Sequence, residues 1–191
     1  MKELKLNKKE QQFLLKLARR SIEHFLEKRE ILKIKETELP SKKLKEKRGT
    51  FVTLLKHNEL RGCIGHIYPV NPIFIDVIQN AVAAGFYDSR FLPLKKEELP
   101  EIKIEISILT QPKKLEFSSP EDLLKKLKQG EDGVIINIDG YQSTFLPQVW
   151  EKLPDKRDFL SHLCLKAGFP PNTWMEPFVE VFVYKVESFH D

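Results

Sequence analysis

The 191-residue sequence contains only two cysteines, Cys63 and Cys164, and no pair spaced as CxxC. Neither a thiolate zinc site nor a disulfide scaffold is therefore indicated. Histidine pairs spaced HxH or HExxH are absent too, so the sequence predicts no metal site. Walker A, GxGxxG and GxSxG motifs are also missing. Nucleotide binding by the routes that those loops provide is not supported.

No apolar run approaches the length that a membrane-spanning helix needs. The first twenty residues, MKELKLNKKEQQFLLKLARR, contain no uninterrupted apolar stretch and do not resemble a secretory signal. We therefore expect a cytoplasmic protein with free thiols and no membrane partner.

Charge is concentrated in one segment. Residues 27–48 hold nine Lys or Arg and five Asp or Glu, which accounts for the whole net charge of +4. Such a segment favours nucleic acid or another polyanion as a partner. It contains no aromatic residue that would stack on bases, so the simpler interpretation is a solvated connector.

Hydrophobic periodicity and turn residues predict the elements. The first helix, at about residues 8–28, begins after a capping box formed by Asn7 and Glu10. A charged connector at about 29–48 precedes a body at 49–191. The body contains two strands joined by a turn at 57–59, a helix from Asn71-Pro72 to Gly85, and a strand over 101–110. A helix from Ser119-Pro120 to Gly130, a hairpin turning at Asp139-Gly140, a helix over 155–168 and a strand over 178–186 follow.

Short strands and helices alternate here without a regular strand–helix rhythm. This pattern is typical of an α+β fold. We predict a single two-lobed domain over residues 1–191, with a mainly antiparallel sheet flanked by helices and a cleft.

The stretch LRGCIGHIYP, residues 60–69, holds the sharpest candidate for chemistry. Cys63 is the candidate nucleophile, and Arg61, two residues away on a strand, is expected to share its face and lower the pKa of the thiol. Gly62 and Gly65 would let a ligand approach the backbone, whose N–H groups would hold an anion. The alternative is an inert, buried cysteine between glycines that mark a bulge.

Other polar residues are weaker candidates. Asp88 and Arg90, in the loop YDSRF, would bind a polar ligand or form an ion pair that only ties the loop down. His66 faces away from Cys63 unless a bulge at Gly65 turns it. Glu105 lies on the polar face of its strand, and Gln148 lies beside Pro147 and Trp150 in a predicted pocket or packed corner. Cys164 lies in an apolar helical stripe and is expected in the core.

Several motifs occur in a specific order: LRGCIG, AAGFYDSRFLPLKKEELPEIKIEISILTQP, GEDGVII, FLPQVW and FLSHLCLKAG. Together they closely resemble the AMMECR1 domain family, from about Gly49 to Phe189. The resemblance implies a compact α+β domain in two parts. Its suspected functional positions are Arg61, Gly62, Cys63, Ile64 and Gly65, then Asp88, Arg90 and Phe91, then Gly133, Leu146, Pro147 and Gln148. It further implies Memo-like and radical SAM proteins as partners. The resemblance does not indicate which cofactor, if any, the protein binds.

Three functions follow from these residues. The first is a thiol-dependent enzyme for group transfer or modification, with Cys63 as nucleophile, Arg61 and Asp88 as catalytic residues, and Gly62, Ile64, Gly65, Arg90 and Gln148 binding the ligand. The second is a binding module for a protein partner or a small anionic ligand, without catalysis. The third is nucleic-acid binding through the basic segment. The residues leave open whether the protein is an enzyme.

Overall fold

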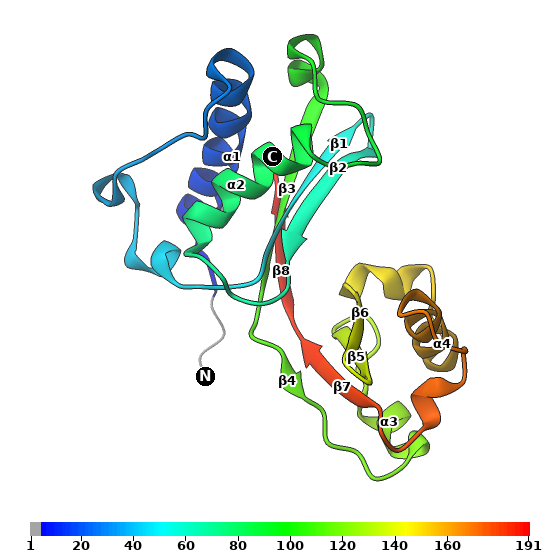
Figure 1. Ribbon diagram of the computed structural model, residues 1–191. Helices are drawn as coiled ribbons and strands as arrows, with labels where there is room; N and C mark the ends of the chain where they lie inside the picture. The colour runs from blue at the N-terminus through cyan, green and yellow to red at the C-terminus, as the bar shows by residue number, and fades with distance from the viewer. Residues whose placement is uncertain (1–4) are drawn as a thin grey trace. The chain divides into compact units, whose positions relative to one another are not determined.

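A computed structural model describes residues 5–191 of the chain (Figure 1). It divides into two compact units. Unit 1 contains the chain up to Gln111 together with Glu187–Asp191, and unit 2 is Pro112–Val186. None of the helices over residues 5–191 combines the length and the apolar character that a membrane span requires.

Unit 1 combines two long helices with a four-stranded sheet of order β2-β1-β3-β8. The sheet is antiparallel where β1 pairs with β2 and with β3. The elements are α1 (Lys8–Lys28), η1 (Glu36–Glu38), η2 (Lys42–Lys45), β1 (Thr50–Lys56), β2 (Glu59–His66), α2 (Ile73–Phe86), η3 (Lys96–Glu101), β3 (Ile102–Leu109) and β8 (Val186–His190).

The predicted capping box at the start of α1 is confirmed. The Asn7 side chain accepts a hydrogen bond from the Glu10 N–H at 3.0 Å, and the Glu10 carboxylate accepts one from the Asn7 N–H at 2.7 Å. The two side chains thus satisfy backbone donors that have no partner inside the helix.

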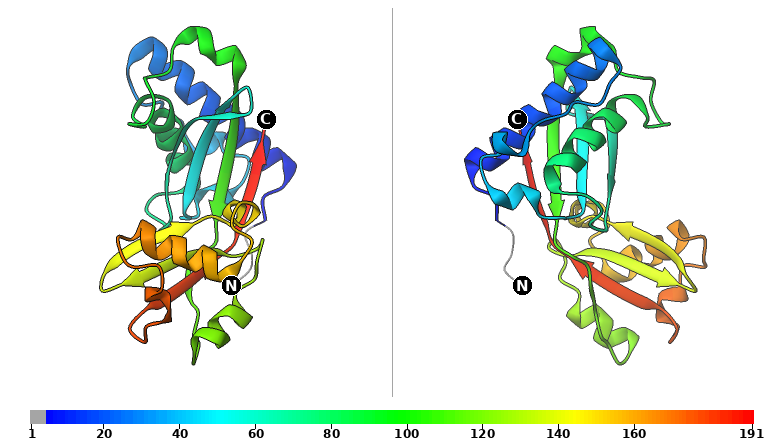
Figure 2. Two further views of the ribbon diagram at one scale, coloured as in Figure 1. Left: turned by 90° about the vertical axis from the view of Figure 1, so that its right-hand side faces the viewer. Right: turned by 60° about the vertical axis from the view of Figure 1, so that its left-hand side comes forward.

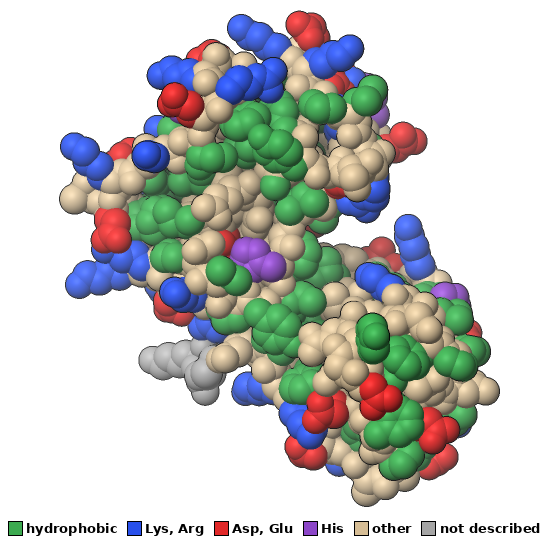
Figure 3. All heavy atoms as spheres, in the orientation of Figure 1, with side chains coloured by type: hydrophobic (Ala, Val, Ile, Leu, Met, Phe, Trp, Pro, Cys, Tyr) green, Lys and Arg blue, Asp and Glu red, His purple; other side chains and the backbone are tan. Residues whose placement is uncertain are grey.

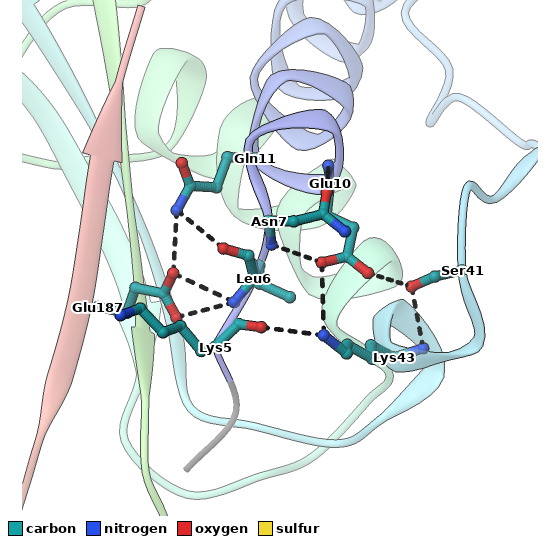
Figure 4. Close-up of polar contacts among 8 residues, drawn as sticks. All are labelled: Lys5, Leu6, Asn7, Glu10, Gln11, Ser41, Lys43 and Glu187. Atoms are coloured by element: carbon teal, nitrogen blue, oxygen red, sulfur yellow. Dashed lines mark hydrogen bonds and ion pairs between the residues drawn. The ribbon is translucent and has the colours of Figure 1, made fainter.

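The same carboxylate joins α1 to the charged connector (Figure 4). Glu10 is buried, and it accepts a hydrogen bond from the Ser41 hydroxyl at 2.6 Å and lies 3.8 Å from Lys43 Nζ. On the other side of α1, Glu187 of β8 accepts a hydrogen bond from the Gln11 amide at 2.9 Å. The connector and the last strand are therefore both fixed to the first turn of the chain's first helix.

Helices α1 and α2 cover one face of the unit 1 sheet (Figure 2). Alternate residues of the strands point into this layer, and Val52, Leu54, Ile104 and Ile106 are completely buried there. Because successive side chains of a strand point to opposite faces, their neighbours lie on the face opposite to α1 and α2. We call this opposite face the outer face.

Unit 2 has a second four-stranded sheet of order β4-β7-β5-β6, with antiparallel pairing throughout. Its core includes Cys164, which is fully buried as predicted. The elements are β4 (Lys113–Lys114), α3 (Pro120–Lys126), β5 (Gly133–Ile138), β6 (Tyr141–Phe145), η4 (Pro147–Glu151), α4 (Lys156–Lys166), η5 (Thr173–Met175) and β7 (Glu180–Tyr184).

The predicted α+β class with antiparallel strands is confirmed, but two details are wrong. The strand predicted over 178–186 is interrupted at Lys185, because β7 and β8 join different sheets. The helix predicted to end at Gly130 ends at Lys126. Gly130, with a φ of 76°, belongs to a separate turn in which the Asp132 carboxylate accepts the Lys128 N–H at 2.7 Å.

Candidate functional site

Strand β2 carries the RGCIG motif along an edge of the unit 1 sheet. A two-residue turn at His57 and Asn58, both with positive φ, connects it to β1. The pairing register shifts between Leu54 and Leu55, so that Arg61 is the extra residue of a bulge. The bulge thus lies at Arg61 and not at Gly65, and it gives the Arg61 side chain its own direction.

Cys63 lies on the outer face, half-buried, in a row with Thr53 of β1 and Glu105 of β3. The Thr53 hydroxyl donates a hydrogen bond to Sγ at 3.1 Å. Burial raises the pKa of the Cys63 thiol above its ordinary value. The Asp88 and Glu105 carboxylates add to this increase, and the hydroxyl and the Arg90 charge oppose it only in part. Cys63 is therefore a neutral thiol at pH 7.

The Arg61 guanidinium makes its hydrogen bonds to Glu98 and to the Leu92 carbonyl and makes none to the Cys63 thiol. Its Nε and Nη2 each donate to a different oxygen of Glu98 at 3.0 Å, and Nη2 also donates to the Leu92 carbonyl at 2.9 Å. Arg61 holds the pKa of Glu98 down at about 2. The expectation that Arg61 lowers the pKa of Cys63 is therefore wrong, because the bulge and Glu98 direct its charge elsewhere.

Asp88 and Arg90 bind the backbone of Cys63 from outside the sheet. The Cys63 N–H donates to Asp88 Oδ2 at 2.9 Å, and Arg90 Nη2 donates to the Cys63 carbonyl at 3.3 Å. The two side chains also pair with each other, through Nε to Oδ1 at 2.9 Å and Nη2 to Oδ2 at 2.7 Å. They supply the acceptor and the donor that a neighbouring strand would supply.

This ion pair holds the pKa of the buried Asp88 carboxyl far below its usual range, with Arg90 as the main cause. The ion pair expected between Asp88 and Arg90 is present and holds the loop to β2, and ligand binding by these residues stays a prediction. The arrangement also covers part of a sheet edge that would otherwise be open to pairing with another chain.

The two glycines of the motif are required by close packing. A Cβ at Gly62 would lie 2.1 Å from the carbonyl oxygen of Ala84 in α2, and one at Gly65 would lie 2.3 Å from the Thr50 carbonyl oxygen. Ile64, between them, packs against the core on the side of α2. A helix and a neighbouring strand therefore occupy the space beside the two glycines, and the expected anion cradle of backbone N–H groups stays a prediction.

His66 points to the α2 side and contacts a carboxylate that the sequence analysis missed. Its Nε2 lies 2.9 Å from Oδ2 of Asp76, a completely buried residue in the first turn of α2. The Asn71 amide donates to the other oxygen at 3.0 Å. Cys63 and His66 consequently form no thiol–imidazole pair, because they lie on opposite faces of one strand.

The bonds from β2 fix the loop of residues 87–93, which we call the presented loop. The Phe91 ring lies near two guanidinium groups, 5.9 Å from that of Arg61 and 5.5 Å from that of Arg90. Two apolar side chains of the loop project into solvent: Tyr87 is 66% exposed and Leu92 is 79% exposed. Leu94, the residue that follows the loop, is buried.

Gln148, the remaining predicted ligand residue, lies in η4 of unit 2 beside the buried Trp150. It lines a surface cavity there. Within residues 5–191 no three His, Cys, Asp or Glu side chains are grouped so that they would hold a metal ion.

The basic connector has acidic partners. Lys43 pairs with Glu10, Lys45 with Glu36, and Arg48 with Glu46. On the face of the molecule drawn in Figure 3, Lys and Arg side chains alternate with Asp and Glu side chains and form no single basic patch. Nucleic-acid binding by this segment stays a prediction.

Comparisons with known proteins give one family model and several similar proteins. The AMMECR1 family model matches residues 15–189. Protein MK0488 of Methanopyrus kandleri is 43% identical over 191 residues, covering 98% of this chain and 91% of the relative. Protein NEQ441 of Nanoarchaeum equitans is 40% identical over 183 residues, with coverages of 93% and 98%. The crystal structure of a protein named PH0010 from Pyrococcus horikoshii is similar with a TM-score of 0.89 and 36% identity, covering 98% of this chain and 94% of that one.

Proposed function

For this chain, which belongs to the AMMECR1 family, we propose the function of a non-catalytic binding module that recognises a protein partner through the presented loop. The observation that carries the proposal is where the polar side chains of the motifs make their hydrogen bonds. Arg61 binds Glu98 and the Leu92 carbonyl, and Asp88 and Arg90 bind each other and the backbone of Cys63. Leu92 projects into solvent from the loop that these side chains hold.

A rigid loop with exposed apolar side chains suits recognition for an energetic reason. Binding orders flexible groups at a cost of about 0.5–1.5 kcal/mol per side chain, and a loop that is already fixed avoids part of this cost. Leu92 and Tyr87 then bring apolar surface whose burial in a partner's pocket is favourable. A small anionic ligand has less support, because Glu98 and Asp88 already neutralise Arg61 and Arg90.

The partners that the family resemblance implies are Memo-like and radical SAM proteins. The test measures binding of this chain to the Memo-like and radical SAM proteins of the same genome by biolayer interferometry. Leu92→Ala should weaken binding about 30-fold, because the binding free energy loses about 2 kcal/mol when the buried leucine side chain is truncated. Cys63→Ser should leave the affinity unchanged. Leu165→Ala, an equally conservative truncation of a 53% exposed leucine in unit 2, is the matched control.

If Cys63→Ser abolished binding and Leu92→Ala did not, the proposal that the presented loop recognises the partner would be contradicted. Absence of binding to both partner classes would contradict the partner assignment.

A second function, thiol-dependent group transfer by Cys63, is favoured by one contact. The hydrogen bond from the Thr53 hydroxyl to Sγ stabilises a thiolate. This function ranks second because burial keeps the thiol protonated. Its test is incubation with a simple thioester at pH 7 followed by intact-mass measurement. Acylation of the wild type but not of Cys63→Ser would support it, and an unmodified wild type would exclude acyl transfer.

A further inference from the structure

Two motifs that the proposed function does not use come together in unit 2. The turn at the start of GEDGVII and the η4 segment of FLPQVW, which lies between β6 and α4 (Figure 1), border one cavity. Its volume is about 400 Å³, and it is lined by Gln129, Gly130, Pro147, Gln148, Trp150 and Glu151. All of these residues belong to unit 2, so the cavity shares no residue with the presented loop of unit 1.

The walls of the cavity are joined to each other. The Trp150 indole N–H donates to the Asp132 carbonyl at 2.8 Å, which links η4 to the turn before β5. The indole also stacks on Phe159 of α4, with ring centroids 3.6 Å apart and planes 5° apart. Since the Asp132 carboxylate in turn holds the Lys128 N–H, the turn is closed on itself. The cavity is thus preformed, which is typical of ligand sites.

The residues that line the cavity include one acidic side chain and no basic side chain. Pro147 and Trp150 contribute apolar surface, and Gln129 and Gln148 contribute amides. Glu151 contributes a carboxylate, and no Lys, Arg or His lines the cavity. Over the described residues 5–191, Glu151 takes part in no ion pair, whereas Glu98 pairs with Arg61 and Asp88 pairs with Arg90. An unpaired carboxylate beside the apolar surface of Pro147 complements a planar cation.

We propose that this cavity binds the guanidinium group of an arginine carried by a protein partner. The cation lies against the Glu151 carboxylate, and its aliphatic stem packs on Pro147, above the buried Trp150 that forms the floor of the cavity. The volume suits one side chain with its flanking backbone and is at the small end of the range for small-molecule sites. The inference does not depend on the presented loop, because different residues in a different unit carry it.

The test is an NMR titration of the full-length ¹⁵N-labelled protein with Nα-acetyl-arginine methylamide. The indole N–H of Trp150 should shift with saturation, and the indole N–H of Trp174, which does not line the cavity, should not. Glu151→Gln should weaken binding about fivefold, as expected for one partly exposed ion pair. Glu176→Gln, at an exposed carboxylate of unit 2 outside the cavity, is the matched control and should change nothing.

Two further titrations separate the alternatives. Nα-acetyl-leucine methylamide should cause no saturable shift, and equal shifts with it would overturn the assignment of a cation site. Free L-arginine should bind more weakly than the blocked arginine, because it lacks the two amide groups that stand for the flanking backbone and carries a charged ammonium and carboxylate in their place. Tighter binding of free arginine would overturn a protein as the source of the guanidinium. An unshifted Trp150 signal would overturn the proposal as a whole.

Discussion

Replacing Asp88 by Asn should release the presented loop from β2. The carboxylate is buried and accepts hydrogen bonds from the Cys63 N–H and from Arg90 Nε and Nη2. Removing one partner of a buried ion pair typically costs 3–5 kcal/mol. We expect about 3 kcal/mol, the low end of that range, because the Arg90 side chain is 54% exposed and water can solvate it after the change.

Hydrogen exchange followed by mass spectrometry measures this loss locally. In Asp88→Asn, the amides of residues 60–66 and 87–93 should exchange about 100-fold faster, which corresponds to roughly 3 kcal/mol. Glu23→Gln, at an exposed carboxylate of α1, is the control and should change stability by less than about 0.5 kcal/mol. If Asp88→Asn exchanged no faster than this control, the carboxylate would not be holding the loop.

Two further changes test the packing and the charges of the same strand. Gly62→Ala should destabilise the protein to urea by about 3 kcal/mol, because the new Cβ meets the Ala84 carbonyl. Gly130→Ala, where φ is 76° and no atom lies near, should cost only about 1 kcal/mol, and equal losses would contradict the packing argument. The Arg61–Glu98 pair should stabilise the protein fully above pH 4.5, the ordinary pKa of Glu98, and progressively less as the pH falls toward its folded pKa of about 2. The difference in unfolding free energy between wild type and Glu98→Gln should therefore shrink between pH 6 and pH 2.5, and a constant difference would contradict it.

The sequence predicted those features that depend on local chemistry. The capping box at Asn7 and Glu10 and the hairpin turn at Asp139-Gly140 have fixed short-range spacings, and both are present. The burial of Cys164 follows from its place in an apolar helical stripe. The spacing or the periodicity of neighbouring residues decides each of these, so no distant contact has to be known.

The interactions of the side chains in the RGCIG motif depend on residues that are distant in the sequence. Nothing near Arg61 in the sequence indicates that Glu98, one of several acidic residues in KKEELPE, is its partner. The alternation of Val179, Val181 and Val183 predicts a strand but not the sheet to which it belongs. The bulge at Arg61 arises from pairing with β1, and it changes the direction that strict alternation assigns to that side chain.

Whether Cys63 is a structural residue of the sheet or a nucleophile is decided most directly by the pKa of its thiol. The rate of alkylation by iodoacetamide, measured across pH 6–11 with peptide mass spectrometry to separate Cys63 from Cys164, gives this value. We predict a pKa above the ordinary 9.0, unchanged by Arg61→Ala. A pKa below 9.0 that rises when Arg61 is removed would contradict the account and restore Cys63 as an activated thiolate.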